Sequence, residues 1–421
     1  MRKHQTTERG RHRSRAIAAI AVFVFAAACD STTTEPIVQE VPIGGLFALT
    51  GSWSANGQVA RAAMQLAIDD ANEYLAGNAA NLRFVARFED TRLDPALALA
   101  KAKALRARGV HVLVGPMSSA EVAVVKPFVD ASDMFLVSAS STAPSLAIAG
   151  DNVFRFVPAD SMQAVAVAAM MQEDGKRVIV PVWRHDAAGE DLAQLVRSQF
   201  VGLGGSVLPG VRYEPGAADF TPVVAALRAQ LQQAIGQYDA NTVAVHLTAM
   251  GEVAALLTIA NADPLVGTVH WYGSDGVAKN QGLLDAPQAA EFAVRTGYPN
   301  PQFGLEEGAR DIWEPLAARI RQVTQSMEPD AYAMAAYDAV WTITRAYVAA
   351  GAGSTSDAAR LKQAFITAAS TGYGATGWTA LNDAGDRKYG NYDFWAIRMS
   401  ADVPRWTRVA RYETRTRQLV R

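Results

Sequence analysis

From Val41 onward, short apolar runs alternate with stretches in which apolar residues recur every three or four positions. This pattern predicts strands at residues 43–49, 82–88, 110–114 and 134–137, and helices at residues 59–74, 95–108 and 120–132. Asp94 is the expected N-cap of the second helix, with Pro95 in its first turn. The pattern restarts with strands at residues 177–183, 206–213, 242–247 and 269–272, and helices at residues 190–203, 220–235 and 252–260. Regular alternation of this kind predicts two α/β lobes with parallel sheets.

The end of the chain is less regular. A helical pattern covers residues 331–350, turn-forming residues dominate 377–391, and residues 392–399 have a strand pattern. Pattern alone assigns these parts to neither lobe.

The N-terminus has the features of an export signal. Six Lys or Arg residues among the first fifteen precede thirteen uncharged apolar residues, 16–28, which is short of the roughly 20 that a membrane-spanning helix needs. Three alanines then precede Cys29, the single cysteine, an order that resembles a bacterial lipobox and implies lipid attachment at Cys29. The alternative is an ordinary signal peptide followed by an incidental cysteine. Residues 29–40 are polar and Thr-rich, which predicts a flexible tether.

Charge and motifs argue against several classes of function. The net charge is −2, and beyond residue 15 the chain has 33 basic and 40 acidic residues, so it lacks the excess positive charge of a nucleic-acid binder. We find no Gly-rich dinucleotide or phosphate loop, no Gly-x-Ser-x-Gly nucleophile motif and no zinc-type histidine pair. We therefore expect no cofactor, no metal and no enzymatic activity.

Polar residues gather where the predicted strands end, which is where open parallel sheets bind ligands. In the first lobe these are Asn56 after the first strand, Ser119 after the third, and Ser140, Ser141 and Thr142 after the fourth. In the second lobe, Asp275 lies in a Gly-Ser-Asp-Gly loop after the last strand. Hydroxyls and free N–H groups suit an anion and a carboxylate suits a cation, so together they favour a zwitterion. The alternative is that these residues only cap helices and shape a turn.

The ordered segments IGGLFALTGSWSANGQVARAAMQLAIDDAN, VLVGPMSSAEVAVVKP, LVSASSTAPSLA, YGSDGV and TALNDAGDRKYGNYDFW resemble the leucine/isoleucine/valine-binding proteins of ABC importers. The resemblance covers residues 41–411. It implies a type I periplasmic-binding-protein fold, with two Rossmann-like lobes joined by three crossover segments and closing on ligand at a hinge. It also implies that Ser119, Ser140 and Thr142 bind the ligand carboxylate and amine, and that Asp275 pairs with the ammonium.

The chain departs from that family at two aromatic positions. Ala188 stands where a tyrosine is common, and residues 246–250 lack the tyrosine that commonly follows the strand there. Trp53 and Tyr298 are candidate replacement walls, with ordinary packing as the alternative. These departures put a branched aliphatic ligand in question.

Together these observations predict a signal peptide at 1–28, a tether at 29–40, a first lobe at 41–158 plus 294–389, and a second lobe at 159–293 plus 390–421. The expected function is capture of an amino acid or amino-acid-like solute for an ABC permease and its ATPase subunits. The protein is expected to be exported and to face the periplasm or cell exterior, held to the membrane only by its lipid anchor. The alternatives are a ligand sensor with the same fold and an amide or ester hydrolase.

Overall fold

The computed structural model describes residues 38–51, 53–78, 80–325, 327–351 and 357–421. The chain divides into two compact units, Met1–Ile37 and Val38–Arg421, and the second is described here. The predicted signal peptide, Cys29 and most of the tether therefore lie outside the described residues. Within the described ranges, no helix combines the length and the apolar character that crossing a membrane requires.

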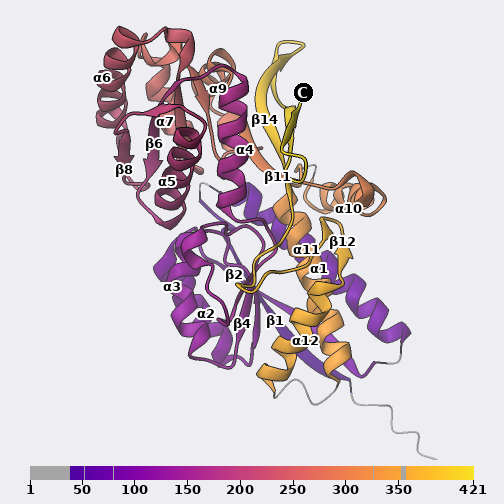
Figure 1. The fold of residues 1–421 in the computed structure, drawn as a ribbon. Helices are drawn as coiled ribbons and strands as arrows, with labels where there is room; N and C mark the ends of the chain where they lie inside the picture. The colour runs from indigo at the N-terminus through magenta and orange to yellow at the C-terminus, as the bar shows by residue number, and fades with distance from the viewer. Residues whose placement is uncertain (1–37, 52, 79, 326, 352–356) are drawn as a thin grey trace, which may run out of the picture. The chain divides into compact units, whose positions relative to one another are not determined.

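The first lobe is built on a five-stranded parallel sheet in the order β2-β1-β3-β4-β5. Helices α2 and α3 cover one face, and α1, α11 and α12 cover the other (Figure 1). The C-terminal helices α11 and α12 thus return to the N-terminal sheet. The elements of this lobe are β1 (Gln39–Phe47), α1 (Ser54–Gly77), β2 (Leu82–Asp90), α2 (Pro95–Ala107), β3 (Val112–Val114), α3 (Ser119–Asp130), β4 (Phe135–Ser138), β5 (Val153–Arg155), α11 (Ala331–Ala350) and α12 (Ala358–Ser370).

The second lobe is built on a parallel sheet in the order β10-β9-β6-β7, with β8 also pairing with β6. Alternate residues of β6 face opposite sides: Val178 packs with α6, α7 and α9, whereas Ile179 packs with α4 and α5. The elements of this lobe are α4 (Asp160–Glu173), β6 (Val178–Arg184), α5 (Ala187–Gly202), β7 (Ser206–Val207), β8 (Val211–Tyr213), α6 (Thr221–Gln237), β9 (Val243–Thr248), α7 (Val253–Asn261), β10 (His270–Tyr272), α8 (Gln281–Leu284) and α9 (Pro287–Thr296).

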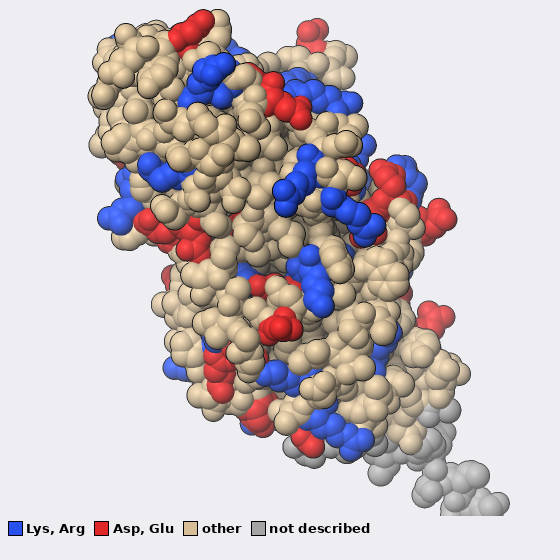
Figure 2. Space-filling view, in the orientation of Figure 1, with Lys and Arg blue, Asp and Glu red and all other residues tan. Residues whose placement is uncertain are grey.

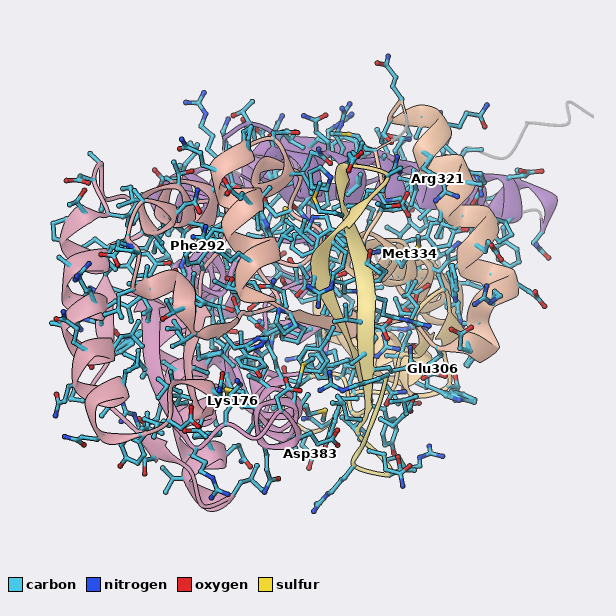
Figure 3. The ribbon with its side chains drawn as sticks, turned by 90° about the horizontal axis from the view of Figure 1, so that it is seen from above. Lys176, Phe292, Glu306, Arg321, Met334 and Asp383 are labelled. Atoms are coloured by element: carbon cyan, nitrogen blue, oxygen red, sulfur yellow. The ribbon has the colours of Figure 1, made fainter. Side chains whose placement is uncertain are left out.

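The chain passes between the lobes three times, and these passages are called here the first, second and third crossovers. They are residues 156–159 after β5, strand β11 (Asn300–Gly304), and residues 388–390 before β14 (Asn391–Ser400). Strand β11 pairs antiparallel with β14, followed by β15 (Val403–Glu413) and β16 (Gln418–Val420). Seen from above, β14 and β15 run between the second lobe, where Phe292 lies, and α10 (Arg310–Val323), which carries Arg321 (Figure 3). The predicted two-lobed α/β architecture is confirmed; the exact lobe boundaries stay predictions.

Two elements differ from the sequence prediction for local reasons. The strand predicted at residues 206–213 is split into β7 and β8, because Pro209 has no N–H to donate and Gly210 has a left-handed φ of 83°. Helix α1 begins at Ser54, five residues earlier than predicted. Its first turn lies against the end of β1, and a Cβ at Gly57 would be 1.9 Å from the Ala48 carbonyl oxygen. Glycine is therefore required there.

A buried group of charged residues joins the crossovers. Arg155, at the end of β5, donates to both oxygens of Asp386 at 2.5 and 2.7 Å, and both side chains are almost fully buried. The neighbouring Arg387 donates to the Phe156 carbonyl of the first crossover at 3.3 Å and lies over the Phe303 ring of the second crossover at 4.6 Å. One cluster therefore contacts parts of the chain that are more than 200 residues apart.

The Asp386→Asn substitution tests this cluster. It keeps the shape of the side chain but leaves the Arg155 guanidinium buried without its counter-charge, so we expect a loss of about 3–5 kcal/mol in the free energy of unfolding. Urea denaturation at pH 7 measures it. The control is Glu40→Gln, which breaks the exposed pair with Arg83 and should cost at most about 1 kcal/mol. Equal losses in the two variants would contradict this role for the buried pair.

Candidate functional site

The carboxyl ends of strands from both lobes meet at one cavity. The first lobe contributes the start of α1, the start of α3 and the loop after β4, and the second contributes the ends of β6, β9 and β10. The volume of the cavity, about 10 Å³, is roughly that of one water position. The lining residues are Trp53, Ser119, Ser140, Thr142, Asp160, Arg184, Ala188, Leu192, Thr248, Ala249, Met250, Ser274, Asp275 and Gly276.

The serine and threonine side chains of the first lobe bind mainly one another. The Ser119 hydroxyl accepts the backbone N–H groups of Thr142 and Ala143 at 3.2 and 3.1 Å, and shares a 3.0 Å hydrogen bond with the Ser141 hydroxyl. The Ser140 hydroxyl donates to the Met117 carbonyl at 2.7 Å. With both of its acceptor positions used by these N–H groups, the Ser119 O–H is the donor in the hydrogen bond to Ser141. Ser119 therefore orders the loop after β4 as well as facing the cavity.

Two carboxyl groups line the cavity, and Gln163 of α4 joins them. Its side-chain amide donates to Asp160 at 2.6 Å, and its carbonyl accepts the Asp275 backbone N–H at 3.0 Å. The Asp160 carboxylate also accepts the Thr142 hydroxyl at 3.0 Å, and the Asp275 carboxylate accepts the Tyr332 hydroxyl at 2.6 Å. Because Tyr332 belongs to α11 and Asp275 follows β10, this last bond joins the two lobes.

Neither of these carboxyl groups forms an ion pair within the described residues. Arg155 is paired with Asp386, and Arg184 is paired with Asp186 and Glu252. Burial raises the pKa of Asp160 well above its usual value, and the charge of Asp275 raises it further. Burial likewise raises the pKa of Asp275. The cavity thus holds two carboxyl groups without an ion-pair partner among the described residues, and their raised pKa values favour the neutral form when no cation is bound.

The second lobe contributes an arginine whose charge is compensated. Arg184, the last residue of β6, is buried and lies 3.1 and 3.2 Å from the two oxygens of Glu252. Glu252 also accepts the Tyr213 hydroxyl at 2.9 Å. Because Asp186 pairs with the same guanidinium, two acids balance one base on this wall.

Of the eight predicted ligand-binding residues, five line the cavity: Trp53, Ser119, Ser140, Thr142 and Asp275. The other three lie outside its lining. Ser141 is fully buried and bonds Ser119, Asn56 donates to Asp330 at 2.9 Å, and Tyr298 packs in the second-lobe core with ring centroids 6.3 Å from Trp271. A role in ligand binding stays a prediction for all eight.

The sequence analysis missed Asp160, Arg184 and Thr248 as cavity residues. Asp160 begins the helix after β5, a three-residue strand too short to recognise by its pattern. Arg184 and Thr248 are the final residues of β6 and β9, and each lies one residue beyond the predicted strand. A more exact prediction of the strand ends would have identified both as candidate site residues. Ala188, where a tyrosine was expected, does line the cavity.

A family model described as "Receptor family ligand binding region" matches residues 59–400, most of the chain. The chain belongs to this family. Among members with curated records, an uncharacterized protein of Methanocaldococcus jannaschii is 29% identical over 397 residues, covering 89% of this chain and 92% of that protein. A Leu/Ile/Val-binding protein of Rhizobium johnstonii is 24% identical and covers 71% of this chain and 84% of its own. A chemotactic signal transduction system substrate-binding protein of Halobacterium salinarum is 30% identical over 42% of this chain and 45% of its own.

Comparison with solved structures shows that this chain has the fold of type I periplasmic binding proteins. The leucine-binding protein LivK of Thermotoga maritima matches with a TM-score of 0.68 and 20% identity, covering 90% of this chain and 98% of that one. A periplasmic binding protein type 1 of Bordetella pertussis matches with a TM-score of 0.71 and 19% identity, covering 88% and 100%. The relatives whose names state a function are binding proteins, which agrees with the prediction that this chain is not an enzyme.

The carboxyl pair makes the stability of the ligand-free protein depend on pH. Folding raises both pKa values, so the pair's favourable contribution is present at acidic pH and is lost as pH rises through the raised pKa. Asp160→Asn removes one of the like charges. We expect this variant to be more stable than the wild type at pH 7, by about 1.4 kcal/mol for each unit by which the pKa is raised, and the difference to shrink toward pH 4.

Urea denaturation of ligand-free protein at both pH values checks this expectation. Asp69→Asn, at an exposed position on α1, is the matched control and should change the stability by no more than about 0.5 kcal/mol. A destabilised Asp160→Asn variant at pH 7 would mean that the hydrogen bonds from Thr142 and Gln163 outweigh the charge repulsion.

Proposed function

We propose that this protein is an extracytoplasmic solute-binding protein that captures a zwitterionic amino acid, or a close analogue, between its two lobes. The observation that carries the proposal is the pair of carboxyl groups, Asp160 and Asp275, that lack an ion-pair partner among the described residues and line a cavity that Ser119 also lines. Burying an unpaired charge is costly, and a ligand ammonium group offsets that cost. The binding proteins among its relatives support the same reading.

The two ends of such a ligand suit opposite parts of the cavity. The ammonium group pairs with Asp275 and Asp160. The carboxylate lies at the start of α3, where the helix dipole favours negative charge, and the Ser119 O–H turns to it from Ser141. The Ser140 and Thr142 hydroxyls donate to Met117 and Asp160, so their part is chiefly to shape this end of the cavity.

Hinge closure accompanies binding in this proposal. The cavity has lining residues from both lobes and a volume of about 10 Å³, so a ligand the size of an amino acid enters only if the lobes move apart. Contacts divided between two lobes favour the closed form once the ligand is bound. The three crossovers are the segments that such a motion bends.

We further propose that the protein is exported and anchored through a lipid on Cys29, and that it delivers its ligand to an ABC permease and its ATPase subunits. The basic and apolar N-terminus and the cysteine after three alanines support the export and the anchor. The structural likeness to ABC transporter substrate-binding proteins supports the delivery to a permease. A second candidate role is ligand sensing, which the likeness to the substrate-binding protein of a chemotactic system favours. The cavity chemistry is the same in both roles.

Asp275→Asn tests the ammonium contact. The variant keeps an oxygen to accept the Tyr332 hydroxyl but removes the charge, so affinity for an amino acid found in a thermal-shift screen should fall by about 2–5 kcal/mol, at least tenfold. Calorimetry measures it. Ser119→Ala should cost about 1.5–3 kcal/mol in affinity, and Asp275→Asn should spare an analogue that lacks the amine. Unchanged amino-acid affinity in folded Asp275→Asn would remove this carboxylate from the binding site.

The anchor is tested at Cys29. Wild-type protein expressed with its own N-terminus should partition with membranes, and Cys29→Ala should be released as soluble protein or remain unprocessed. Membrane fractionation and mass spectrometry of the mature N-terminus check this. Detection of an unmodified Cys29 within an intact chain would contradict lipid attachment.

A further inference from the structure

We infer that the side chain of the bound amino acid is uncharged and forms hydrogen bonds, as an amide or hydroxyl does, instead of being branched and aliphatic. This inference rests on the proposed function and specifies the ligand class of the same cavity. It follows from two buried polar atoms, one from each lobe, that belong to lining residues and have no partner among the described residues.

The first atom is the indole nitrogen of Trp53. This residue, the N-cap of α1, is 3% exposed, and its Nε1–H has no hydrogen-bond partner within the described residues. Its ring packs against Tyr332, with centroids 6.4 Å apart, and the Tyr332 hydroxyl bonds Asp275. The unsatisfied donor therefore belongs to a ring packed next to the proposed ammonium partner.

The second atom is the hydroxyl oxygen of Thr248, the final residue of β9. Thr248 is 4% exposed, and its Oγ1 is likewise unpartnered in the described part of the chain. Its backbone carbonyl, in contrast, accepts the Tyr213 hydroxyl at 3.1 Å. Because the great majority of buried polar atoms are paired, two unpaired atoms on residues that line one cavity favour a ligand that supplies their partners.

An aliphatic side chain on the ligand cannot form a hydrogen bond with either of these two atoms. It would bury the Trp53 N–H and the Thr248 hydroxyl without replacing the hydrogen bonds that water offers them. An amide or a hydroxyl can both accept from the indole and donate to the threonine. Ala188 and Ala249 are small, so these two lining positions offer an aliphatic group little contact area.

The charge on the second-lobe wall argues against an anionic side chain. Arg184 is the basic residue that lines the cavity, and Asp186 and Glu252 already balance its charge. A second ligand carboxylate would lie near Asp160 and Asp275, and no unpaired cation among the described lining residues could receive it. A neutral polar side chain is the class that fits both the unpaired atoms and the charges.

Isosteric ligand pairs test the inference on the mature wild-type protein. Asparagine and leucine share one side-chain skeleton, as do threonine and valine, and calorimetry gives the dissociation constant of each. We expect the polar member of at least one pair to bind about tenfold or more tightly than its apolar partner. Tighter binding of leucine and valine would overturn the inference while the proposed function stands. Failure of every common amino acid to bind would overturn the proposed function, and the inference with it.

Three variants test which residues cause the preference for polar over apolar ligands. Thr248→Val and Trp53→Phe each remove one unpaired atom and should reduce the ratio of polar to apolar affinity about tenfold. The matched control is Thr344→Val, which removes a buried hydroxyl bonded to the Val340 carbonyl within α11 and should leave the ratio unchanged. If Thr248 had only a structural role, its substitution would weaken both members of a pair equally, and that result would contradict the assignment.

Discussion

The Asp160 and Asp275 carboxyl groups, buried without an ion-pair partner among the described residues, impose the constraint around which this structure is organised. A buried carboxylate needs hydrogen-bond donors or an opposite charge. Here Thr142, Gln163 and Tyr332 supply the donors, from the loop after β4, from α4 and from α11. The opposite charge is left for a ligand. These buried carboxyl groups lower the stability of the ligand-free protein at the proposed binding site, and functional sites commonly reduce stability in this way.

Helix α11 packs its apolar face in the core of the first lobe, and its first turn carries Tyr332. Tyr332 reaches Asp275 because Asp330 caps the start of α11, by accepting the Ala333 N–H at 2.8 Å, and accepts the Asn56 amide of α1 at 2.9 Å. Asn56 therefore supports the site from outside the cavity lining. The buried cluster of Arg155, Asp386 and Arg387 likewise fixes the first and third crossovers against the sheet of the first lobe. On the surface, acidic and basic side chains are interspersed on the face shown in Figure 2.

Membership of a receptor ligand-binding family determines the scaffold but leaves the ligand open, because a fold hosts many ligands through changes at a few side chains. In this chain the second-lobe wall has its own set of side chains. Ala188 and Ala249 are small, Thr248 presents an unpaired hydroxyl and Arg184 is neutralised by two acids. In the proposed binding mode, Ser119 of the first lobe and Asp160 and Asp275 of the second contact the charged groups common to all amino acids. Trp53 and Thr248, one from each lobe, contact the variable side chain.

Much of this arrangement was accessible from the sequence. Hydrophobic periodicity predicted two parallel α/β lobes, because burial of strands between helices leaves a strong local pattern. The rule that ligands bind beyond the carboxyl ends of strands located Ser119, Ser140, Thr142 and Asp275, all of which line the cavity. The fold prediction was confirmed because it depends on residues close together along the chain, whereas the ligand-binding roles stay predictions.

Tertiary structure decided the rest. Tyr332 bonds Asp275 across 57 positions, Asn56 bonds Asp330 across 274, and Arg155 bonds Asp386 across 231, and nothing in the local pattern of either partner indicates the other. Tyr298 had a plausible position for a wall of the cavity, but packing against Trp271 places it in the core. Whether a buried polar atom such as Thr248 Oγ1 has a partner depends on every neighbour in space. A chain determines its local periodicity residue by residue, whereas pairing and charge compensation are settled only when distant segments pack together.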